Sequence, residues 1–497
     1  MSAANETERP DTVRELRHLV AGRWRTGSGE AVVDLNPAHP TQVVAEGSLA
    51  GVDDLDAAVA AARDAFPRWA ATPHPVRGRI LDKAAEILDR RADSWGAELS
   101  REEGKTLAEG VGEVRRAAEI FRYYGSEGTR AIGDVFASPR PGEQIQVIHK
   151  PLGAVAVITP FNFPIAIPAW KIAPALSYGN TVVWKPASVV PLLAVRLAEA
   201  LAEAGLPEGV LSLIVADGRV GGRLVEHPGI DAVTFTGSTT VGKRLIRACG
   251  RLARPIQTEM GGKNAAAVLS DADLELAAAE VLAGAFRSTG QKCTATSRLI
   301  VTDTVADEFL ELLTERAEKL RVGDPLSAEV QMGPLITPEA RDEIQAKVDA
   351  SLRDEPVRVL TGGQAYQDEF RRTGAFLPPT IVELSGDSVL WRDELFGPVL
   401  AVRRAPDDET ALGLVNDSEF GLSAAVFTDN LRAVSAAIEL LDVGVLHINS
   451  ETAGADPHVP FGGAKASAFG PKEQGRAARE FFTTTKTVYV RGSREGL

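Results

Sequence analysis

Short apolar runs alternate with helical stretches from Gly153 onward, and this alternation limits the possible folds more than any other feature of the chain. The apolar runs read AVAVIT, TVVWKP, VLSLIVA and AVTFTGS, and helical periodicity lies between them at residues 166–176, 190–204 and 219–227. Strands separated by helices form βαβ units, in which the strands are parallel and helices cover both faces of the sheet. The sequence therefore predicts an α/β fold with a doubly wound parallel sheet.

A second alternation of helix and strand follows the glycine pair Gly261 and Gly262. We place a domain boundary there and expect a second α/β domain that ends at about residue 470. The length of 497 residues also favours two or more domains, because single domains usually hold about 100 to 200 residues. Amphipathic periodicity at 52–69, 77–99 and 112–124 predicts a mostly helical N-terminal part, which follows a loose tail of about ten residues.

Residues 136–150 contain a turn with Pro139, Pro141 and Gly142 between extended segments, a pattern typical of a β-hairpin that stands off its domain. The segment FFTTTKTVYV near the C-terminus is rich in β-branched and aromatic residues and is predicted to be a strand. We expect this strand to pair with the hairpin. Arms of this kind often mediate subunit contacts, so the sequence favours a homo-oligomer.

Charge and composition argue against several classes of function. The formal net charge of −14 disfavours nucleic acid as a partner, because a polyanion would be repelled. The most apolar stretch, residues 153–170, is interrupted by three prolines, so we expect no membrane span. The first residues lack a basic segment followed by an apolar one, which favours a cytoplasmic location. Seven scattered histidines and two distant cysteines predict neither a metal site nor a disulfide framework.

Cys293 is the residue that most strongly suggests chemistry. It lies in the segment FRSTGQKCTATSR, after a helical stretch, and neighbouring Lys292 is expected to favour the reactive thiolate. A free cysteine is more often a buried and inert side chain, and Cys249 keeps that interpretation. Cys293 differs because of two other segments: IQTEMGG places Glu259 near a strand end, and TPFNFP places Asn162 in a turn.

Seven segments, in this order and at these spacings, resemble the motifs of the aldehyde dehydrogenase superfamily. They are TPFNFP, VVWKPAS, FTGSTTVGK, TEMGGKN, GQKC, ELFGPV and PFGGAKASAFG, and the resemblance covers essentially the whole chain from about residue 30. It implies an aldehyde dehydrogenase-like fold with two doubly wound parallel-sheet domains and a β-hairpin oligomerisation arm. By this resemblance, 1–128 and 150–261 form the coenzyme-binding domain and 262–470 the catalytic domain. Residues 129–149 and 478–497 would be the oligomerisation elements of a homodimer or homotetramer.

The same resemblance implies that an aldehyde is oxidised to a carboxylic acid through a thiohemiacetal and a thioester on Cys293. An aldehyde holds its hydrogen too firmly for direct hydride loss, whereas the oxyanion of a thiohemiacetal expels hydride onto nicotinamide. The side-chain amide of Asn162 and the main-chain N–H of Cys293 would form the oxyanion hole. Glu259 would then activate the water that hydrolyses the thioester, and Glu473 would help to relay protons.

No strand is followed by the dinucleotide fingerprint G-x-G-x-x-G, so the residues alone leave the coenzyme open. The resemblance implies NAD or NADP. The implied contacts are Lys185 and Ser188 at the adenosine ribose, Gly218 and Gly221 at the adenine side, Thr159, Gly237 and Ser238 toward the pyrophosphate, and Glu394 and Phe396 at the nicotinamide ribose.

Two positions depart from the family pattern. Strict NAD users tend to carry an acidic residue three positions after Lys185, where this chain has Ser188. A carboxylate there would accept a hydrogen bond from the ribose 2′-hydroxyl and repel a 2′-phosphate, so Ser188 favours NADP as coenzyme. Phe161 stands where tryptophan is common.

Among subfamilies, the chain is most similar to the 2,5-dioxovalerate (α-ketoglutarate semialdehyde) dehydrogenases, through IPAWKIAPAL, GQKCTATSR and GPKEQGRAAREFF. Succinate semialdehyde dehydrogenases generally carry an arginine before the lysine of the first segment, where this chain has Trp170, so Trp170 is also a candidate substrate residue. An acidic substrate needs a cation, and Arg287 and Arg298 are the candidates. For both arginines an internal salt bridge is the alternative.

Three other functions remain open at this point. A broad-specificity aliphatic or aromatic aldehyde dehydrogenase would share the same motifs. A catalytically inactive scaffold of the same fold would usually lack a catalytic residue, yet Cys293, Glu259, Asn162 and Lys185 are all present. An acylating dehydrogenase, which passes the acyl group to coenzyme A, would waste its thioester if Glu259 activated water.

Overall fold

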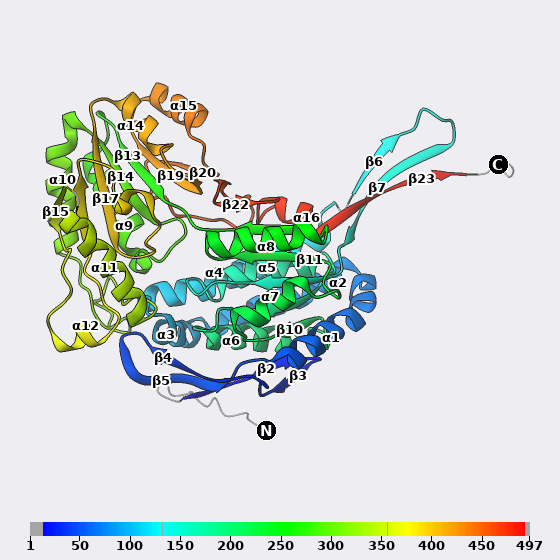
Figure 1. The fold of residues 1–497 in the computed structure, drawn as a ribbon. Coiled ribbons are helices and arrows are strands. Elements are labelled where there is room, and N and C mark those ends of the chain that lie inside the picture. The colour runs from blue at the N-terminus through cyan, green and yellow to red at the C-terminus, as the bar shows by residue number, and fades with distance from the viewer. Residues whose placement is uncertain (1–12, 132, 355, 493–497) are drawn as a thin grey trace.

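The computed structural model describes residues 13–131, 133–354 and 356–492 and contains two large sheets with a thin arm that projects from one side (Figure 1). The predicted loose tail lies outside the described residues. The first large sheet has the strand order β22-β12-β11-β8-β9-β10-β2-β3. These strands are β2 (His18–Val20), β3 (Arg23–Arg25), β8 (Ala154–Ile158), β9 (Thr181–Lys185), β10 (Leu211–Leu213), β11 (Ala232–Thr236), β12 (Ile256–Glu259) and β22 (Ala468–Phe469).

The strands from β12 to β10 are parallel, which confirms the predicted parallel sheet, and antiparallel strands are added at both edges. Alternate residues of β8 enter two different cores. Val155 and Val157 are buried with α2 to α6, whereas Ala154 and Ala156 are buried with α1, α7 and α8. Burial on both faces explains why this strand is apolar throughout instead of alternating.

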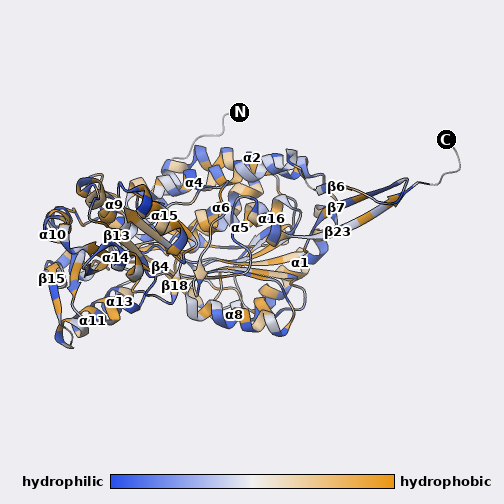
Figure 2. Cartoon of the chain, turned by 90° about the horizontal axis from the view of Figure 1, so that it is seen from above, coloured by the Kyte–Doolittle hydropathy of each residue, from blue (hydrophilic) through white to orange (hydrophobic). Residues whose placement is uncertain are grey.

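Helices cover both sides of the first sheet, and most of them turn polar faces outward while the apolar strands lie between them (Figure 2). These helices are α1 (Val52–Ala71), α2 (His74–Arg90), α3 (Ala92–Glu103), α4 (Leu107–Ser126), α5 (Ala166–Ser177), α6 (Pro191–Glu203), α7 (Gly218–Glu226) and α8 (Thr239–Arg251). A short helix, η1 (Glu127–Thr129), follows α4. In the part of the chain that the structure describes, no helix is long and apolar enough to cross a membrane.

Two features of the N-terminal part differ from the prediction. The single helix expected at 77–99 is divided into α2 and α3, because Arg91 between them has the non-helical angles φ −104° and ψ 5°. A small sheet of β1 (Arg14–Leu16), β5 (His39–Ser48) and β4 (Ala31–Asn36) also precedes α1. Register shifts along β4 and β5 prevent a regular alternation of buried residues, so the sequence pattern did not indicate these strands.

The second large sheet follows in the order β15-β16-β17-β14-β13-β19-β20, and all neighbouring pairs except β15 and β16 are parallel. Its strands are β13 (Asn264–Val268), β14 (Thr296–Thr302), β15 (Val357–Thr361), β16 (Thr380–Leu384), β17 (Val399–Ala405), β19 (Ser423–Phe427) and β20 (Val445–Ile448). The intervening helices are α9 (Leu274–Phe286), η2 (Arg287–Gly290), α10 (Asp303–Glu318), α11 (Pro338–Asp354), α12 (Glu369–Thr373), α13 (Val389–Arg392), α14 (Asp408–Val415) and α15 (Leu431–Leu440). This sheet confirms the second predicted α/β unit.

The chain passes from one large sheet to the other within a few residues. The first sheet's β12 ends at Glu259, and the second sheet's β13 begins at Asn264. The chain later returns, because β22 pairs antiparallel with β12 and sets Ala468 opposite Glu259. A small bridge of β18 (Phe420–Gly421) and β21 (Ala464–Lys465) lies next to this return. This arrangement supports a division near Gly261, and we keep the domain limits given above as a proposal.

The arm is a three-stranded antiparallel sheet of β6 (Gly133–Ala137), β7 (Glu143–Pro151) and β23 (Thr483–Arg491), and it projects from the body (Figure 1). The register of β23 against β7 runs from Thr483 opposite Pro151 to Arg491 opposite Glu143. The expected pairing of the terminal strand with the hairpin is thus confirmed. Helix α16 (Ala477–Phe482) anchors the arm, because Phe481 and Phe482 are buried in the core of the first sheet.

Candidate active site

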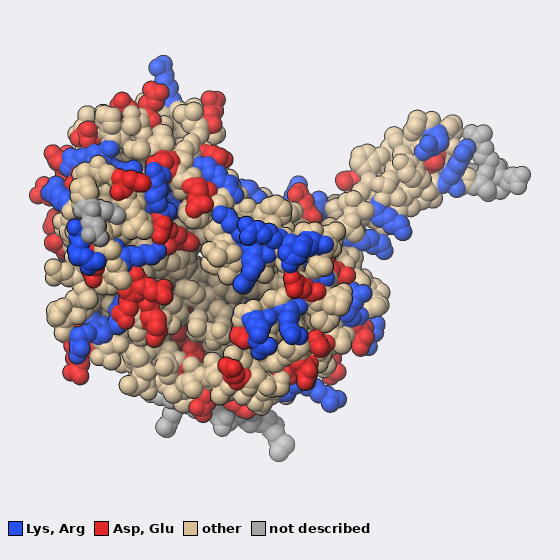
Figure 3. Space-filling view, in the orientation of Figure 1, with Lys and Arg blue, Asp and Glu red and all other residues tan. Residues whose placement is uncertain are grey.

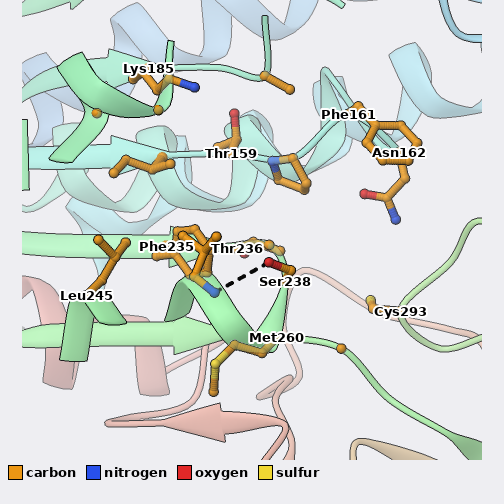
Figure 4. Close-up of a pocket in the computed structure, with 18 of the residues that line it drawn as sticks. Thr159, Phe161, Asn162, Lys185, Phe235, Thr236, Ser238, Leu245, Met260 and Cys293 are labelled. Atoms are coloured by element: carbon orange, nitrogen blue, oxygen red, sulfur yellow. Dashed lines mark hydrogen bonds between the residues drawn. The ribbon is translucent and has the colours of Figure 1, made fainter. Parts of the chain in front are cut away.

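A cavity of about 560 Å³ opens at the carboxyl ends of the first sheet's parallel strands. This edge of a doubly wound sheet is the usual place for a ligand, because the loops that leave parallel strands converge there. Thr159 follows β8, Lys185 ends β9, Ser238 follows β11 and Gly261 follows β12, and all four line the cavity. Figure 4 shows Lys185 toward one end and Cys293 toward the other, with Thr159 and Ser238 between them.

Most of the residues proposed from the sequence meet in this cavity. Those that line it are Thr159, Asn162, Lys185, Gly218, Gly221, Gly237, Ser238, Cys293, Glu394 and Phe396. Ser188 lies three positions beyond Lys185 and is half-buried, and Ala187 lines the wall in its place. Glu259 lies directly before the lining residue Met260.

The glycines of α7 leave one wall of the cavity without side chains, and this bare wall accommodates a close-fitting ligand. A Cβ atom placed on Gly218 would meet nothing within 4 Å, and one on Gly221 would lie 3.5 Å from Cδ of Lys185. Ser238 caps α8 by accepting a hydrogen bond from the Val241 N–H, so the positive end of this helix lies beside the cavity. A ligand can therefore lie close to the main chain of α7 on one wall. On the other wall, the N-terminus of α8 favours an anionic group of the ligand.

Lys185 supplies a cation at the same end of the cavity. Burial lowers the pKa of its ammonium group to about 8, and the carboxylate of Asp217 acts in the opposite direction. An ammonium group that has lost much of its hydration gains strongly from an anionic or hydroxyl-rich ligand. The bare wall, the helix end and this lysine together fit the adenosine and pyrophosphate parts of a dinucleotide.

Cys293 lies in the loop between η2 and β14, and a tight turn presents it to the cavity. Ser288 and Thr289 form this turn with the left-handed φ angles of 51° and 55°. Burial raises the pKa of the Cys293 thiol to about 12, and the carboxylates of Glu259 and Glu394 add to the increase. The side chain is therefore a thiol at neutral pH in the absence of a ligand.

The expectation that Lys292 promotes the thiolate is wrong. Its ammonium group lies 3.4 Å from the carbonyl oxygen of Ala283 and 3.4 Å from a carboxylate oxygen of Glu451. The charge is therefore paired on the other side of the loop. Sequence adjacency to Cys293 did not indicate which way the side chain points.

The turn that carries Asn162 is held by buried charged groups of the N-terminal helices. Lys105 donates a 2.7 Å hydrogen bond to the main-chain carbonyl of Asn162 and is ion-paired with Glu113 at 2.6 Å. Glu113 also accepts hydrogen bonds from the N–H groups of Ile165 and Ala166. Neither Lys105 nor Glu113 was identified from the sequence, because Lys105 lies in the connection between two predicted helices and Glu113 looked like a solvent-exposed residue of an amphipathic helix.

The side chain of Asn162 lies at the same end of the cavity as Cys293 (Figure 4). Its Oδ1 atom, which can only accept, is buried without a hydrogen-bond partner. Within the described residues, the Nδ2 amide group of Asn162 and the main-chain N–H of Cys293 also make no hydrogen bond. Unpartnered N–H donors beside a thiol are what a site requires if it is to stabilise an oxyanion that exists only during the reaction.

Glu259 ends β12 and is only 3% exposed. Burial raises the pKa of its carboxyl group well above the ordinary value, and the nearby carboxylate of Glu473 raises it further. Its Oε2 atom has no hydrogen-bond partner, and its Oε1 atom lies 2.4 Å from the place of a Cβ atom on Gly462. Gly462 has φ +155° and leaves room for this carboxyl group.

Glu473 is buried next to Glu259 and is ion-paired with Lys171. The ammonium group of Lys171 also donates a 3.0 Å hydrogen bond to the Thr234 hydroxyl on β11. Lys171 was missed in the sequence, although a lysine within the apolar segment IPAWKIAPAL was a usable signal. Glu259, Glu473 and Lys171 thus form a buried chain of proton donors and acceptors near the Cys293 thiol.

Glu394 and Phe396 face the cavity from the loop after α13. The Gly262 N–H donates a 2.9 Å hydrogen bond to Glu394, and burial raises the pKa of this carboxyl group to about 7. Phe396 has a φ angle of 58°, and its ring meets that of Phe161 edge to face with centroids 5.7 Å apart. The departure from tryptophan at Phe161 therefore leaves an aromatic contact in place.

The three substrate candidates occupy different environments. Trp170 packs on Phe461 with ring centroids 5.7 Å apart. Arg287 does not line the cavity, and its side chain is 62% exposed and ion-paired with Glu451 at 3.1 Å. Arg298 is not among the cavity residues, because its buried guanidinium donates to four main-chain carbonyls, of Lys263, Leu414, Val415 and Asp417. We therefore do not assign substrate binding to Arg298. The described residues contain no cluster of histidine, cysteine, aspartate and glutamate that could hold a metal ion.

Comparison with known proteins agrees with this geometry. The chain is 41% identical over 477 residues to an alpha-ketoglutaric semialdehyde dehydrogenase from Bacillus subtilis, which covers 95% of this chain and 98% of the relative. It is 42% identical over 480 residues to a 2,5-dioxopentanoate dehydrogenase from Saccharolobus solfataricus, with the same coverage. A betaine aldehyde dehydrogenase from Staphylococcus aureus, solved in complex with NAD+, superposes with a TM-score of 0.92 at 29% identity and covers 96% of this chain and 95% of its own. Residues 24–488 match the aldehyde dehydrogenase family, so the chain belongs to that family.

Proposed function

We propose that this aldehyde dehydrogenase oxidises 2,5-dioxopentanoate (2,5-dioxovalerate, α-ketoglutarate semialdehyde) to 2-oxoglutarate with NADP or NAD as coenzyme. The observation that carries the proposal is that one cavity contains both the thiol of Cys293 and the coenzyme-type groups around Lys185 and Ser238. A nucleophile and an electron acceptor must share one site if the substrate is to be oxidised while it is covalently bound.

The reaction begins when the thiol of Cys293 gives up its proton to water and Sγ attacks the carbonyl carbon of the aldehyde. The carbonyl oxygen becomes an oxyanion, which accepts hydrogen bonds from the Asn162 side-chain amide and the Cys293 N–H. One such donor contributes roughly 3 to 4 kcal/mol to the stability of the transition state. Lys105 supports this step indirectly, because it holds the main chain at Asn162.

The nicotinamide ring of the bound coenzyme supplies the hydride acceptor that converts the thiohemiacetal into a thioester. Lys185, Ser238 and Glu394 would hold the coenzyme at its adenosine ribose, its pyrophosphate and its nicotinamide ribose. The fit rests on the bare α7 wall, the capped end of α8 and the carboxylate positioned by the Gly262 N–H.

Hydrolysis of the thioester requires a base, and Glu259 is the proposed one. A carboxyl group with a raised pKa is a stronger base than an ordinary glutamate once it is ionised. The proton taken from water can pass from Glu259 to the carboxylate of Glu473, which lies next to Glu259 and is ion-paired with Lys171. Water activation by Glu259 also distinguishes this scheme from transfer of the acyl group to coenzyme A.

The substrate is proposed from the two relatives above 40% identity, whose names specify this dicarbonyl acid. Its distal carboxylate needs a cation, and Arg287 is the remaining candidate from the sequence. Arg287 would exchange its partner Glu451 for the substrate. A broad-specificity aldehyde dehydrogenase is the second candidate, because the ring contact between Trp170 and Phe461 also suits an apolar substrate.

The preferred coenzyme is proposed to be NADP. Ser188 leaves the ribose 2′ position without a carboxylate, which favours NADP.

The arm of β6, β7 and β23 would join subunits into a homodimer or homotetramer, since it exposes apolar side chains such as Phe136 and Tyr489. We place the enzyme in the cytoplasm.

The test is a spectrophotometric screen for reduced coenzyme with wild type, Cys293→Ala and Arg287→Ala. The aldehydes are 2,5-dioxopentanoate, succinate semialdehyde, benzaldehyde and hexanal, each with NAD and with NADP. We expect 2,5-dioxopentanoate to give the highest kcat/KM, Cys293→Ala to be inactive, and Arg287→Ala to raise KM for the acidic aldehydes alone. Equal activity with hexanal would favour the broad-specificity enzyme. Absence of acid product without coenzyme A would favour the acylating enzyme.

A further inference from the structure

The end of the cavity farthest from Cys293 is a slot between α7 and α8. One wall is formed by Gly218, Gly221 and Gly222 and carries no side chains. The opposite wall, on α8, presents Val241, Arg244 and Leu245. A flat ring can lie against bare backbone on one side and apolar side chains on the other, so the slot fits a planar heterocycle better than a sugar or a phosphate.

Arg244 is the cation in this slot, and no residue described in the structure forms an ion pair or hydrogen bond with its guanidinium. Two other cations of α8 are engaged, since Lys243 lies 3.6 Å from Glu419 and Arg251 lies 3.0 Å from Glu226, and Arg247 does not line the cavity. Figure 3 shows Lys and Arg side chains gathered over α8, beside the hollowed centre of this face. The unpaired guanidinium is therefore available to a ligand.

We infer that Arg244 stacks its guanidinium plane on the adenine ring of the bound coenzyme and so fixes the adenosine end in the slot. The inference rests on the proposed function, in which nicotinamide lies next to Cys293. Since Lys185 and Leu245 lie toward the end of the cavity away from Cys293, and Ser238 lies between, the adenosine half must extend toward α7 and α8. A planar guanidinium stacks on aromatic rings, whereas an ammonium group does not offer this contact.

This role separates Arg244 from the groups that recognise the ribose. Lys185 and Asp217 act at the strand end, and Arg219 is turned toward Asp217 at 3.6 Å. Arg244 approaches from the opposite helix, over the face of the ring. Stacking on adenine is the same in NAD and NADP, so Arg244 tightens both coenzymes equally and leaves the choice between them to the ribose pocket.

Binding of ADP-ribose and 2′-phospho-ADP-ribose to the full-length protein, measured by isothermal titration calorimetry, tests the inference without turnover. Both ligands carry adenine and pyrophosphate but no nicotinamide. The variants are Arg244→Ala, Arg244→Lys and the matched control Arg247→Ala, which removes one positive charge from the same helix outside the cavity. Thermal melts of each variant verify folding.

We expect Arg244→Ala to weaken both ligands by about fivefold, as for loss of a stacked cation. Arg244→Lys should weaken them nearly as much, because it keeps the charge but loses the plane, and Arg247→Ala should bind as wild type does. Unchanged affinity in Arg244→Ala, full affinity in Arg244→Lys, or a loss confined to the 2′-phosphorylated ligand would each overturn the stacking role. A wild-type protein that binds neither ligand would instead overturn the proposed coenzyme site, and the role of Arg244 with it.

Discussion

The side-chain amide of Asn264 donates a 2.7 Å hydrogen bond to the main-chain carbonyl of Cys293 and a second, of 2.9 Å, to that of Ala295. Its Oδ1 atom accepts from the Ser423 N–H, so every contact of this buried side chain serves the loop or the strand behind it. The first residue of the second sheet thereby fixes the loop that carries Cys293. The position of the thiol is a property of the sheet, not of the loop alone.

Asn264→Ala should lower both stability and turnover. It leaves two carbonyls and one N–H without partners, which costs about 2 to 4 kcal/mol of unfolding free energy. A displaced thiol should lower kcat by about tenfold to a hundredfold. Thermal melts and steady-state kinetics measure the two effects. Asn180→Ala is the control, since Asn180 is equally buried but bonds Leu152 and Phe482 at the base of the arm, away from the cavity.

The control should lose stability while the folded enzyme keeps its kcat. If Asn264→Ala behaved in the same way, the loop would hold Cys293 without help from Asn264. Asn264→Asp tests the donor group alone. It keeps an acceptor for the Ser423 N–H but cannot donate a hydrogen bond to the carbonyls of Cys293 and Ala295. It should therefore be as slow as the alanine variant.

Glu259→Gln should block hydrolysis more than it blocks oxidation. An amide cannot take a proton from water, and removal of a general base typically costs about 10² to 10⁴ in rate. The expected result in stopped-flow is a rapid burst of reduced coenzyme, close to one per site, followed by very slow turnover. Mass spectrometry of the quenched protein should then find the acyl group on Cys293. A slow reaction without a burst would place Glu259 in the oxidation step.

The thiol should titrate at unusually high pH in the free enzyme. Since burial raises the pKa of Cys293 to about 12, the thiolate fraction and the rate of alkylation by iodoacetamide should rise about tenfold per pH unit between about pH 7 and pH 10. Cys249→Ala serves as background and should react identically, because Cys249 is buried and its own pKa is raised to about 11. A rate that levels off below about pH 8 would mean that the thiolate is stabilised in the free enzyme.

Much of the fold could be predicted because both large sheets depend on local patterns. Apolar runs such as that of β8 are buried on both faces, and the glycines after β12 mark where the chain leaves the first sheet. The small N-terminal sheet could not be predicted in this way, because its register shifts remove the alternation. The break at Arg91 was also hidden, since no proline or glycine marks it.

Site residues could be predicted where a sequence motif fixes the local geometry, but the sequence did not show which way an individual side chain points. Asn162 and Lys185 follow or end strands at the same edge of the first sheet, and Cys293 reaches the same cavity from the loop before β14 of the second sheet. Arg298 was a reasonable candidate by type, yet its guanidinium donates to main-chain carbonyls at the C-terminal end of α14. Lys171 shows the converse, since only the tertiary structure reveals a buried partner in Glu473.

Ser188→Glu should convert the enzyme toward NAD. A carboxylate three positions after Lys185 can accept from the ribose 2′-hydroxyl and repels a 2′-phosphate, so kcat/KM with NADP should fall by about a hundredfold or more, near 2.7 kcal/mol. Ser188→Ala separates charge from the lost hydroxyl and should change the ratio of the two coenzymes by less than about threefold. Wild type that already prefers NAD a hundredfold would contradict the role given to Ser188. An unchanged ratio in Ser188→Glu would mean that this half-buried position does not reach the ribose, and that the wall at Ala187 sets the preference instead.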